Sequence, residues 1–179
     1  TIRLMLGTGI RGQEMLALEV ANIEPDGSAI HVLQATKRIK GTTVVGNAKN
    51  SNSYRRVPIP HNLRPYVVMM RNNATGYIWE SPKKKGCPCN SSHFERAFKT
   101  ALQQVEGVRV LTPHCCRHTY VSQMQFLGVD ISTIQHLVGH ADINMTQHYL
   151  HVQESIRQNA INKFSNAFSF DKTEEDHMD

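Results

Sequence analysis

The segment between residues 112 and 139 constrains the fold most, because helix start and stop signals stand at both of its ends and in its middle. Thr112-Pro113 is typical of a helix start, and Gly128 is a stop signal for that helix. Asp130 can cap a second helix, which Gly139 ends. The expected helices therefore cover residues 113–126 and 131–137.

The same segment carries polar side chains that suggest chemistry on a phosphate. His114 and Arg117 are three residues apart on the expected helix, so they share a face and can converge on one anion. His140 follows directly after Gly139, and Tyr149 supplies a hydroxyl on a further helix that we expect to begin at residue 144 or 145. Cationic groups beside a tyrosine favour metal-free phosphoryl transfer through a covalent phosphotyrosine. Each residue alone is more often a core or capping side chain, so the interpretation depends on the ordered set.

Two more cations precede this segment. Arg11 follows a Gly7-Thr8-Gly9 turn, whose freed backbone amides we expect to face an anion. Arg11 also opens a helix, where a cation is electrostatically unfavourable, so a bound anion would account for its position. Lys49 lies in a Ser/Asn-rich hairpin turn. His114 is near its helix start, where the dipole and burial disfavour protonation, and a neutral imidazole suits a general base.

The remaining pattern predicts an α+β fold that is mainly α, with one small antiparallel sheet of three strands. Residues 81–92 are expected to form a loop in which the lysine run of residues 83–85 is solvated, with phosphate contact as the minority interpretation. Ser91-Ser92 is expected to cap a helix whose core face includes Phe94, Phe98, Leu102 and Val105. The expected strands are residues 29–36, 42–45 and 55–59, and the other expected helices are residues 1–6, 12–19, one from 60 onward, and 152–168.

With these residues in order, the chain resembles the catalytic domain of tyrosine recombinases, the lambda-type integrase family. The resemblance covers about five-sixths of the chain and is strongest to integrases of conjugative transposons and temperate phages. Its motifs are an arginine in a TGxR-type turn, a hairpin lysine before an SxRxVP strand, HxxR, LGH and the tyrosine. They fall on Arg11, Lys49, His114 with Arg117, His140 and Tyr149.

The resemblance implies site-specific cleavage and rejoining of DNA through a 3′-phosphotyrosine, in integration and excision of a mobile element. Tyr149 would be the nucleophile, Arg11 and Arg117 would hold the two non-bridging oxygens, and His140 would donate to the same phosphate. Lys49 would be the acid for the leaving 5′-oxygen, with Lys40 as the next candidate, and His114 would accept the tyrosine proton or orient Arg117. Neither a metal, nor ATP, nor another cofactor is implied.

Composition supports one domain of a DNA-binding protein. The 179 residues carry a formal net charge of +5, which suits a phosphate backbone. We expect residues 1–170 to be the catalytic domain, as a fragment without the N-terminal core-binding and arm-binding domains, and residues 171–179 to be an acidic, disordered tail. No apolar run of membrane-spanning length is visible, and a cytoplasmic, prokaryotic protein is expected.

The implied partners are double-stranded DNA and further copies of the chain in a tetrameric synapse. An apolar stripe recurs at helical spacing after Tyr149, and it can pack on its own domain or dock in trans on a neighbouring protomer. The stripe comprises Ile156, Ala160, Ile161, Phe164, Ala167 and Phe168.

Other functions remain open at the level of sequence. A type IB topoisomerase would use the same residues, a chromosome-dimer resolvase belongs to the same family, and a DNA-binding regulator could keep the fold without the activity. A zinc-stabilised module is a minority alternative. It could use the four cysteines, which we expect to be reduced thiols, or His136 with His140. The cysteines are Cys87, Cys89, Cys115 and Cys116.

Overall fold

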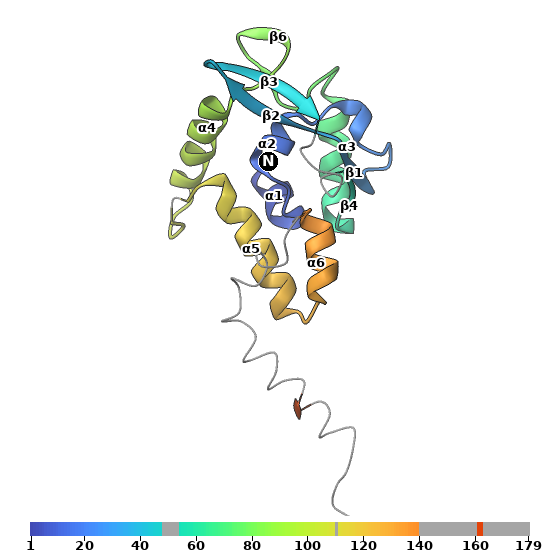
Figure 1. The fold of residues 1–179 in the computed structure, drawn as a ribbon. Helices are drawn as coiled ribbons and strands as arrows, with labels where there is room; N and C mark the ends of the chain where they lie inside the picture. The colour runs from blue at the N-terminus through green and yellow to red at the C-terminus, as the bar shows by residue number, and fades with distance from the viewer. Residues whose placement is uncertain (48–53, 110, 140–160, 163–179) are drawn as a thin grey trace, which may run out of the picture.

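A computed structural model of the chain describes residues 1–47, 54–109, 111–139 and 161–162. The fold is mixed and mainly helical, as expected from the sequence (Figure 1). The helices are α1 (Ile2–Thr8), α2 (Gly12–Leu16), α3 (Arg64–Asn72), α4 (Ser91–Gln103), α5 (Pro113–Phe126) and α6 (Ile131–Val138), with short 3-10 helices η1 (Val20–Asn22) and η3 (His61–Leu63). The strands are β1 (Ala29–Val32), β2 (Gln34–Ile39), β3 (Thr42–Asn47), β4 (Arg55–Pro58), β5 (Glu80–Ser81) and β6 (Lys84–Pro88).

The strands pair two by two, and this differs from the single three-stranded sheet that we expected. Within the described residues, β1 pairs with β4, β2 with β3 and β5 with β6, all antiparallel. The expected strand over residues 29–36 is interrupted at the exposed Leu33, where the chain changes partner. Val32 lies opposite Arg55 on β4, whereas Gln34 lies opposite Asn47 on β3.

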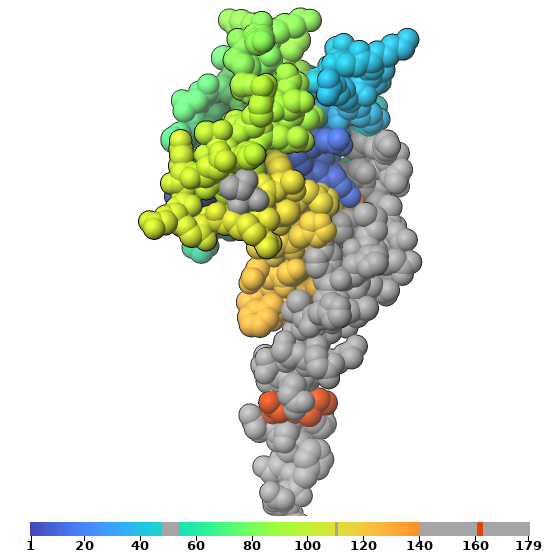
Figure 2. Space-filling view, turned by 90° about the vertical axis from the view of Figure 1, so that its left-hand side faces the viewer, coloured from blue at the N-terminus to red at the C-terminus, as the bar shows by residue number. Residues whose placement is uncertain are grey.

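The expected loop of residues 81–92 is wrong as far as Pro88, where β6 ends. Ser81 pairs with Lys84, which makes a β5–β6 hairpin that carries the exposed lysines of residues 83–85. Lysine and glycine are depleted in strands, so this segment gave no strand signal. Figures 1 and 2 both show this hairpin and the β2–β3 hairpin projecting at the same end of the molecule.

The main core lies between α1, α2, β1, β4, α3 and α4, and a smaller apolar cluster joins α5 to α6. On α4, Phe94 and Phe98 are buried and Leu102 packs against the core, as expected. The expectation for Val105 is wrong, because α4 ends at Gln103 and Val105 is 52% exposed. The smaller cluster consists of Val121, Ile134 and Val138, so α6 is held against α5 by its buried face.

The helix ends follow the signals in the sequence closely. The Asp130 carboxylate accepts a hydrogen bond from the Thr133 N–H at 3.0 Å and caps α6, and Gly139 ends α6 in the left-handed region with φ 66°. Two details differ from expectation. The side chain of Asn90, one residue before Ser91, caps α4. Helix α2 ends at Leu16, because the N–H groups of Ala17 and Leu18 bond to carbonyls three residues back.

Several expected features lie outside the described residues. These are the hairpin turn with Lys49, the helix with Tyr149, most of residues 152–168, and the acidic tail. Ile161 and Asn162 are described, and both are helical. Over the described part of the chain, none of the helices has the length and apolarity needed to span a membrane.

Candidate active site

Arg11 stands at the N-cap of α2, and its side chain reaches across to the end of α6. Its Nη2 donates to the Gly139 carbonyl at 2.8 Å, and its Nη1 contacts the Val138 carbonyl at 3.5 Å. Nη1 also donates to Glu14 Oε1 at 2.8 Å. The side chain is 30% exposed, so part of the guanidinium still faces the surface.

Glu14 is the acidic centre of this region. Its side chain is 4% exposed, and its two oxygens accept four hydrogen bonds, two from Arg11 and two from Arg55. Burial by itself raises the pKa of Glu14, but the hydrogen bonds and charge of Arg55, together with Arg11, lower the pKa below its ordinary value. Glu14 is therefore a carboxylate that holds two guanidinium groups.

Arg117 approaches the same place from α5. It is 2% exposed; its Nη1 donates to the Gly9 carbonyl at 2.8 Å and its Nη2 to the Val138 carbonyl at 2.6 Å. Position 9 requires glycine for two reasons. Its φ of 63° is unfavourable for other residues, and a Cβ there would lie 2.6 Å from the Tyr120 ring. This corrects our expectation for the Gly7–Gly9 turn. The Gly9 N–H bonds to the Met5 carbonyl, and it is the Gly9 carbonyl that serves the site.

Three arginines thus converge on the last turn of α6. Arg55 donates to the Leu137 carbonyl at 2.9 Å, Arg117 to Val138 and Arg11 to Gly139. The last carbonyls of a helix have no partner within the helix and carry the negative end of its dipole, so they attract cations. With one carboxylate among three guanidinium groups, the cluster keeps a positive charge suited to an anion.

His114 lies at the second position of α5, on the exposed side of this cluster. Its pKa is lowered first by partial desolvation and then by the charges of His118, Arg117 and Arg11. The direction of this shift agrees with the neutral imidazole that we expected, and the role of His114 as a base stays a prediction. The ring of His118 stands edge-on to that of His114, with 4.5 Å between their centroids.

A hollow of about 350 Å³ brings Arg11 and His114 to one surface. It lies between the N-terminal ends of α2, α4 and α5. Its lining includes Gln13, Ser91, Glu95 and Thr112 as further polar residues. Arg117 is buried and donates to the carbonyls of Gly9 and Val138, whereas His114 is exposed and lines the hollow. The charge of Arg117 nevertheless acts on His114.

Arg11, His114 and Arg117 lie close together, as expected from the sequence, but the parts of Glu14 and Arg55 in the cluster were not expected. A signal existed for each. Glu14 stands three residues after the N-cap, the capping-box position. Arg55 takes an inward position on β4, where residues alternate between buried and exposed. Lys49, His140 and Tyr149 lie outside the described residues, and their places in the site stay predictions.

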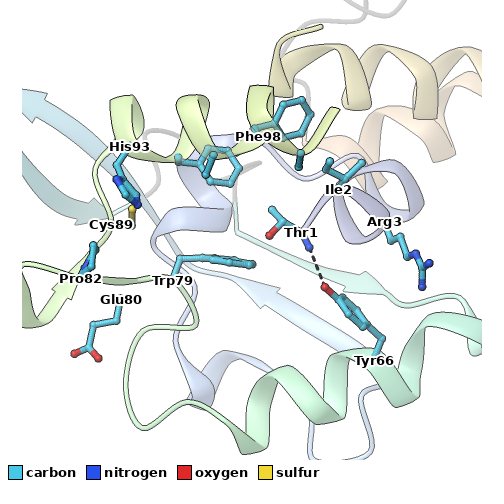
Figure 3. A pocket seen from close by; sticks show the side chains of 13 residues that line it. Thr1, Ile2, Arg3, Tyr66, Trp79, Glu80, Pro82, Cys89, His93 and Phe98 are labelled. Atoms are coloured by element: carbon cyan, nitrogen blue, oxygen red, sulfur yellow. Dashed lines mark hydrogen bonds between the residues drawn. The ribbon is translucent and has the colours of Figure 1, made fainter. Parts of the chain in front are cut away.

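A second hollow, of about 560 Å³, opens between α1, α4 and β5 (Figure 3). It is lined mostly by apolar side chains, among them Trp79, Phe94 and Phe98, and none of the three predicted site residues that the structure describes lines it. The buried indole Nε1 of Trp79 has no hydrogen-bond partner among the described residues.

Metal ligation finds no support in the part of the chain that the structure describes. No group of three or more His, Cys, Asp or Glu side chains there could hold an ion. The four cysteines are free thiols, with Cys89 and Cys116 buried. His140, His148 and His151 fall outside the described ranges.

The model of the phage integrase family matches residues 1–155. The chain belongs to the phage integrase family. Among similar proteins, a XerC-like tyrosine recombinase of Caldanaerobacter subterraneus subsp. tengcongensis is 28% identical over 92% of this chain and 48% of its own length. The XerA tyrosine recombinase of Pyrococcus furiosus is 26% identical over 90% of this chain and 52% of its own. This integrase-family chain therefore spans about half the length of these relatives.

Solved structures show the same fold. The Tn1549 transposon integrase, in complex with circular intermediate DNA, aligns with a TM-score of 0.72 at 20% identity, over 83% of this chain and 53% of that chain. The XerA recombinase aligns with a TM-score of 0.65 at 23% identity, over 91% and 56% respectively. The described part of this chain therefore has the same fold as these two recombinases.

Proposed function

We propose that this protein is a site-specific DNA recombinase, an integrase that cleaves and rejoins DNA through a 3′-phosphotyrosine in the movement of a mobile element. Tyr149 attacks the scissile phosphate and displaces the 5′-oxygen, which leaves as a hydroxyl. A second DNA 5′-hydroxyl then attacks the phosphotyrosine and releases the tyrosine. The phosphodiester energy is kept in the covalent link, so the reaction consumes no ATP.

The single observation that carries this proposal is the convergence of Arg11 and Arg117 on the end of α6, with His114 lining the same hollow as Arg11. Guanidinium groups suit the two non-bridging oxygens of a phosphate and stabilise the charge that develops on them. In our proposal, a DNA phosphate at the hollow replaces the carbonyls as the partner of part of the Arg11 guanidinium. Lys49 protonates the leaving oxygen, His140 donates to the phosphate, and neutral His114 accepts the tyrosine proton or orients Arg117.

The partner that we propose is double-stranded DNA, bound by a tetramer of the protein in a synapse. The formal charge of +5 supports attraction to a phosphate backbone. The integrase of Tn1549 was solved with DNA, and XerH was solved bound to its difH substrate. We further propose that the whole protein carries a core-binding domain before residues 1–170, acts in the cytoplasm on the nucleoid, and exchanges its C-terminal helix in trans.

The test is covalent trapping of the protein on a nicked suicide duplex that carries candidate element ends, in excess EDTA. We expect a protein–DNA adduct on a denaturing gel, because arginines and histidine take the place of a metal as charge stabilisers. Loss of the adduct in EDTA and its return with magnesium or zinc would contradict the mechanism.

A second candidate is a chromosome-dimer resolvase. The observation that favours it is the naming of several relatives, which are called XerC, XerD or XerA. An integrase and a resolvase would use the same chemistry, so they differ only in the DNA sequence that each one cleaves. Trapping on duplexes from a chromosomal recombination site, and not on element ends, would favour the resolvase.

A further inference from the structure

Arg55, at the start of β4, is buried as deeply as any charged side chain of the site. Its side chain is 1% exposed. Its Nη1 and Nη2 donate to the two oxygens of Glu14 at 3.1 and 2.8 Å, and its Nε donates to the Leu137 carbonyl at 2.9 Å. One guanidinium therefore joins three elements, α2, β4 and α6.

The end of α6 is built around this side chain. A Cβ on Gly139 would lie 2.8 Å from Arg55 Nη1, so the guanidinium occupies the space that a side chain there would need. The main chain of Gly139 accepts the hydrogen bond from Arg11, and His140 follows it directly. Arg55 thus packs against the turn that leads into a predicted catalytic residue.

Arg55 also shares its carboxylate with Arg11. Glu14 Oε1 accepts from Arg11 Nη1 at 2.8 Å and from Arg55 Nη1 at 3.1 Å, and Glu14 Oε2 accepts from the Arg11 N–H at 2.9 Å. The direction of the carboxylate is fixed by the two parallel bonds from Arg55, and this direction in turn fixes one side of the Arg11 guanidinium. The Gly139 carbonyl, beside Arg55, fixes the other side.

We infer that Arg55 is a positioning residue, which sets the place of Arg11 on the phosphate through Glu14 and through the end of α6. This inference rests on the proposed function. Arg55 is too buried to touch DNA itself, so its effect should fall on the rate of cleavage and spare the affinity. Lysine cannot replace it, because an ammonium group cannot make the forked bond to Glu14 together with the bond to α6.

The experiment compares Arg55→Lys with Arg56→Lys in the complete protein. Arg56 is the next residue of β4 and makes a similar forked pair with Glu24, at 2.9 and 3.1 Å, but it is 53% exposed and faces away from the site. We expect Arg55→Lys to slow single-turnover adduct formation at least tenfold, with the Kd for DNA within twofold of wild type. Arg56→Lys should leave both within twofold.

A second arm separates positioning from a general loss of structure. In an Arg11→Ala background there is no guanidinium left to place, so Arg55→Lys should slow the remaining cleavage threefold or less. An equal tenfold loss in both backgrounds would overturn the inference, as would an unchanged rate for Arg55→Lys alone. If Arg55→Lys does not fold, Glu14→Gln breaks the same pair and is compared in both backgrounds in the same way. Absence of any adduct from wild type would contradict the proposed function instead.

Discussion

At the scale of single residues, Glu14 shows how a buried charge can organise a site. All four of its hydrogen bonds come from two arginines, which favour the ionised form and lower the pKa of Glu14 despite its burial. A carboxylate whose pKa is lowered in the folded state contributes stability above its ordinary value of 4.5, and this contribution is lost as the pH falls through the lowered pKa.

Acid unfolding should therefore reveal Glu14. We expect Glu14→Ala to destabilise the protein by about 3–5 kcal/mol near pH 7, because it leaves buried guanidinium groups without their counter-charge. The difference from wild type should shrink below pH 4.5, as Glu14 becomes protonated in the wild type. Thermal unfolding of both proteins from pH 3 to 7 checks this. A difference that does not change with pH would show that the charge of Glu14 is unimportant.

His114 predicts a pH dependence of the cleavage rate, through a basic group where Glu14 is an acidic one. Its pKa lies below the ordinary 6.5, so the neutral base predominates above that value, and the cleavage rate should rise with pH and level off by pH 7. His118→Gln removes one of the charges that lower this pKa, so it should move the midpoint to higher pH. His114→Gln should abolish the rise of the cleavage rate with pH, and it should lower the rate at pH 7 by about 10²-fold or more. Identical pH–rate profiles for all three proteins would exclude His114 as the base.

At the scale of secondary-structure elements, the end of α6 joins the parts of the site. Gly139 and Gly128 both follow a helix with a left-handed φ, of 66° and 77° respectively. Their surroundings differ, because a Cβ on Gly128 would meet nothing within 4 Å, whereas a Cβ on Gly139 would meet Arg55. The two glycines form a matched pair.

Alanine substitution separates backbone strain from crowding. Gly128→Ala should cost about 1–2 kcal/mol of stability, the cost of a left-handed conformation. Gly139→Ala should cost clearly more and should also slow cleavage, since the alanine pushes Arg55 and the last turn of α6 apart. Chemical denaturation and adduct formation are the measurements. Equal losses for the two variants would mean that the contact with Arg55 does not matter.

Elements also show what the sequence could predict. Helix boundaries at Asp130 and Gly139 are local, since each depends on a cap or a turn within a few residues, and these predictions were confirmed. The pairing of β1 with β4 is not local, so the change of partner at Leu33 was missed. The β5–β6 hairpin is local, but its lysines and glycine gave no strand signal. The Arg55–Glu14 pair joins residues 41 apart in sequence, and only the folded structure brings them together.

At the scale of the whole molecule, this chain covers about half the length of its relatives, and its assembly on DNA is a proposal. The apolar stripe after Tyr149 is the surface that we propose to contact a neighbouring protomer. Ile161, the stripe residue that the structure describes, is helical and 62% exposed.

Removal of residues 152–179 tests the stripe. If the stripe docks in trans, the truncated protein should keep its melting temperature and form fewer crosslinked oligomers on DNA. It should also cleave more DNA without prior assembly. Thermal melting and crosslinking on a suicide duplex are the two measurements. A truncated domain that no longer folds would show that the stripe belongs to the domain's own core.

We propose above all that Tyr149 attacks a phosphate that the arginine cluster holds. Tyr149→Phe removes only the attacking oxygen, and Tyr54→Phe is a matched control, because Tyr54 is exposed and precedes β4. On a nicked suicide duplex, wild type and Tyr54→Phe should form the covalent adduct, and Tyr149→Phe should form none while its Kd for DNA stays near that of wild type. Mass spectrometry of the trapped peptide should place the DNA on Tyr149. An adduct at the wild-type level from Tyr149→Phe would contradict the account.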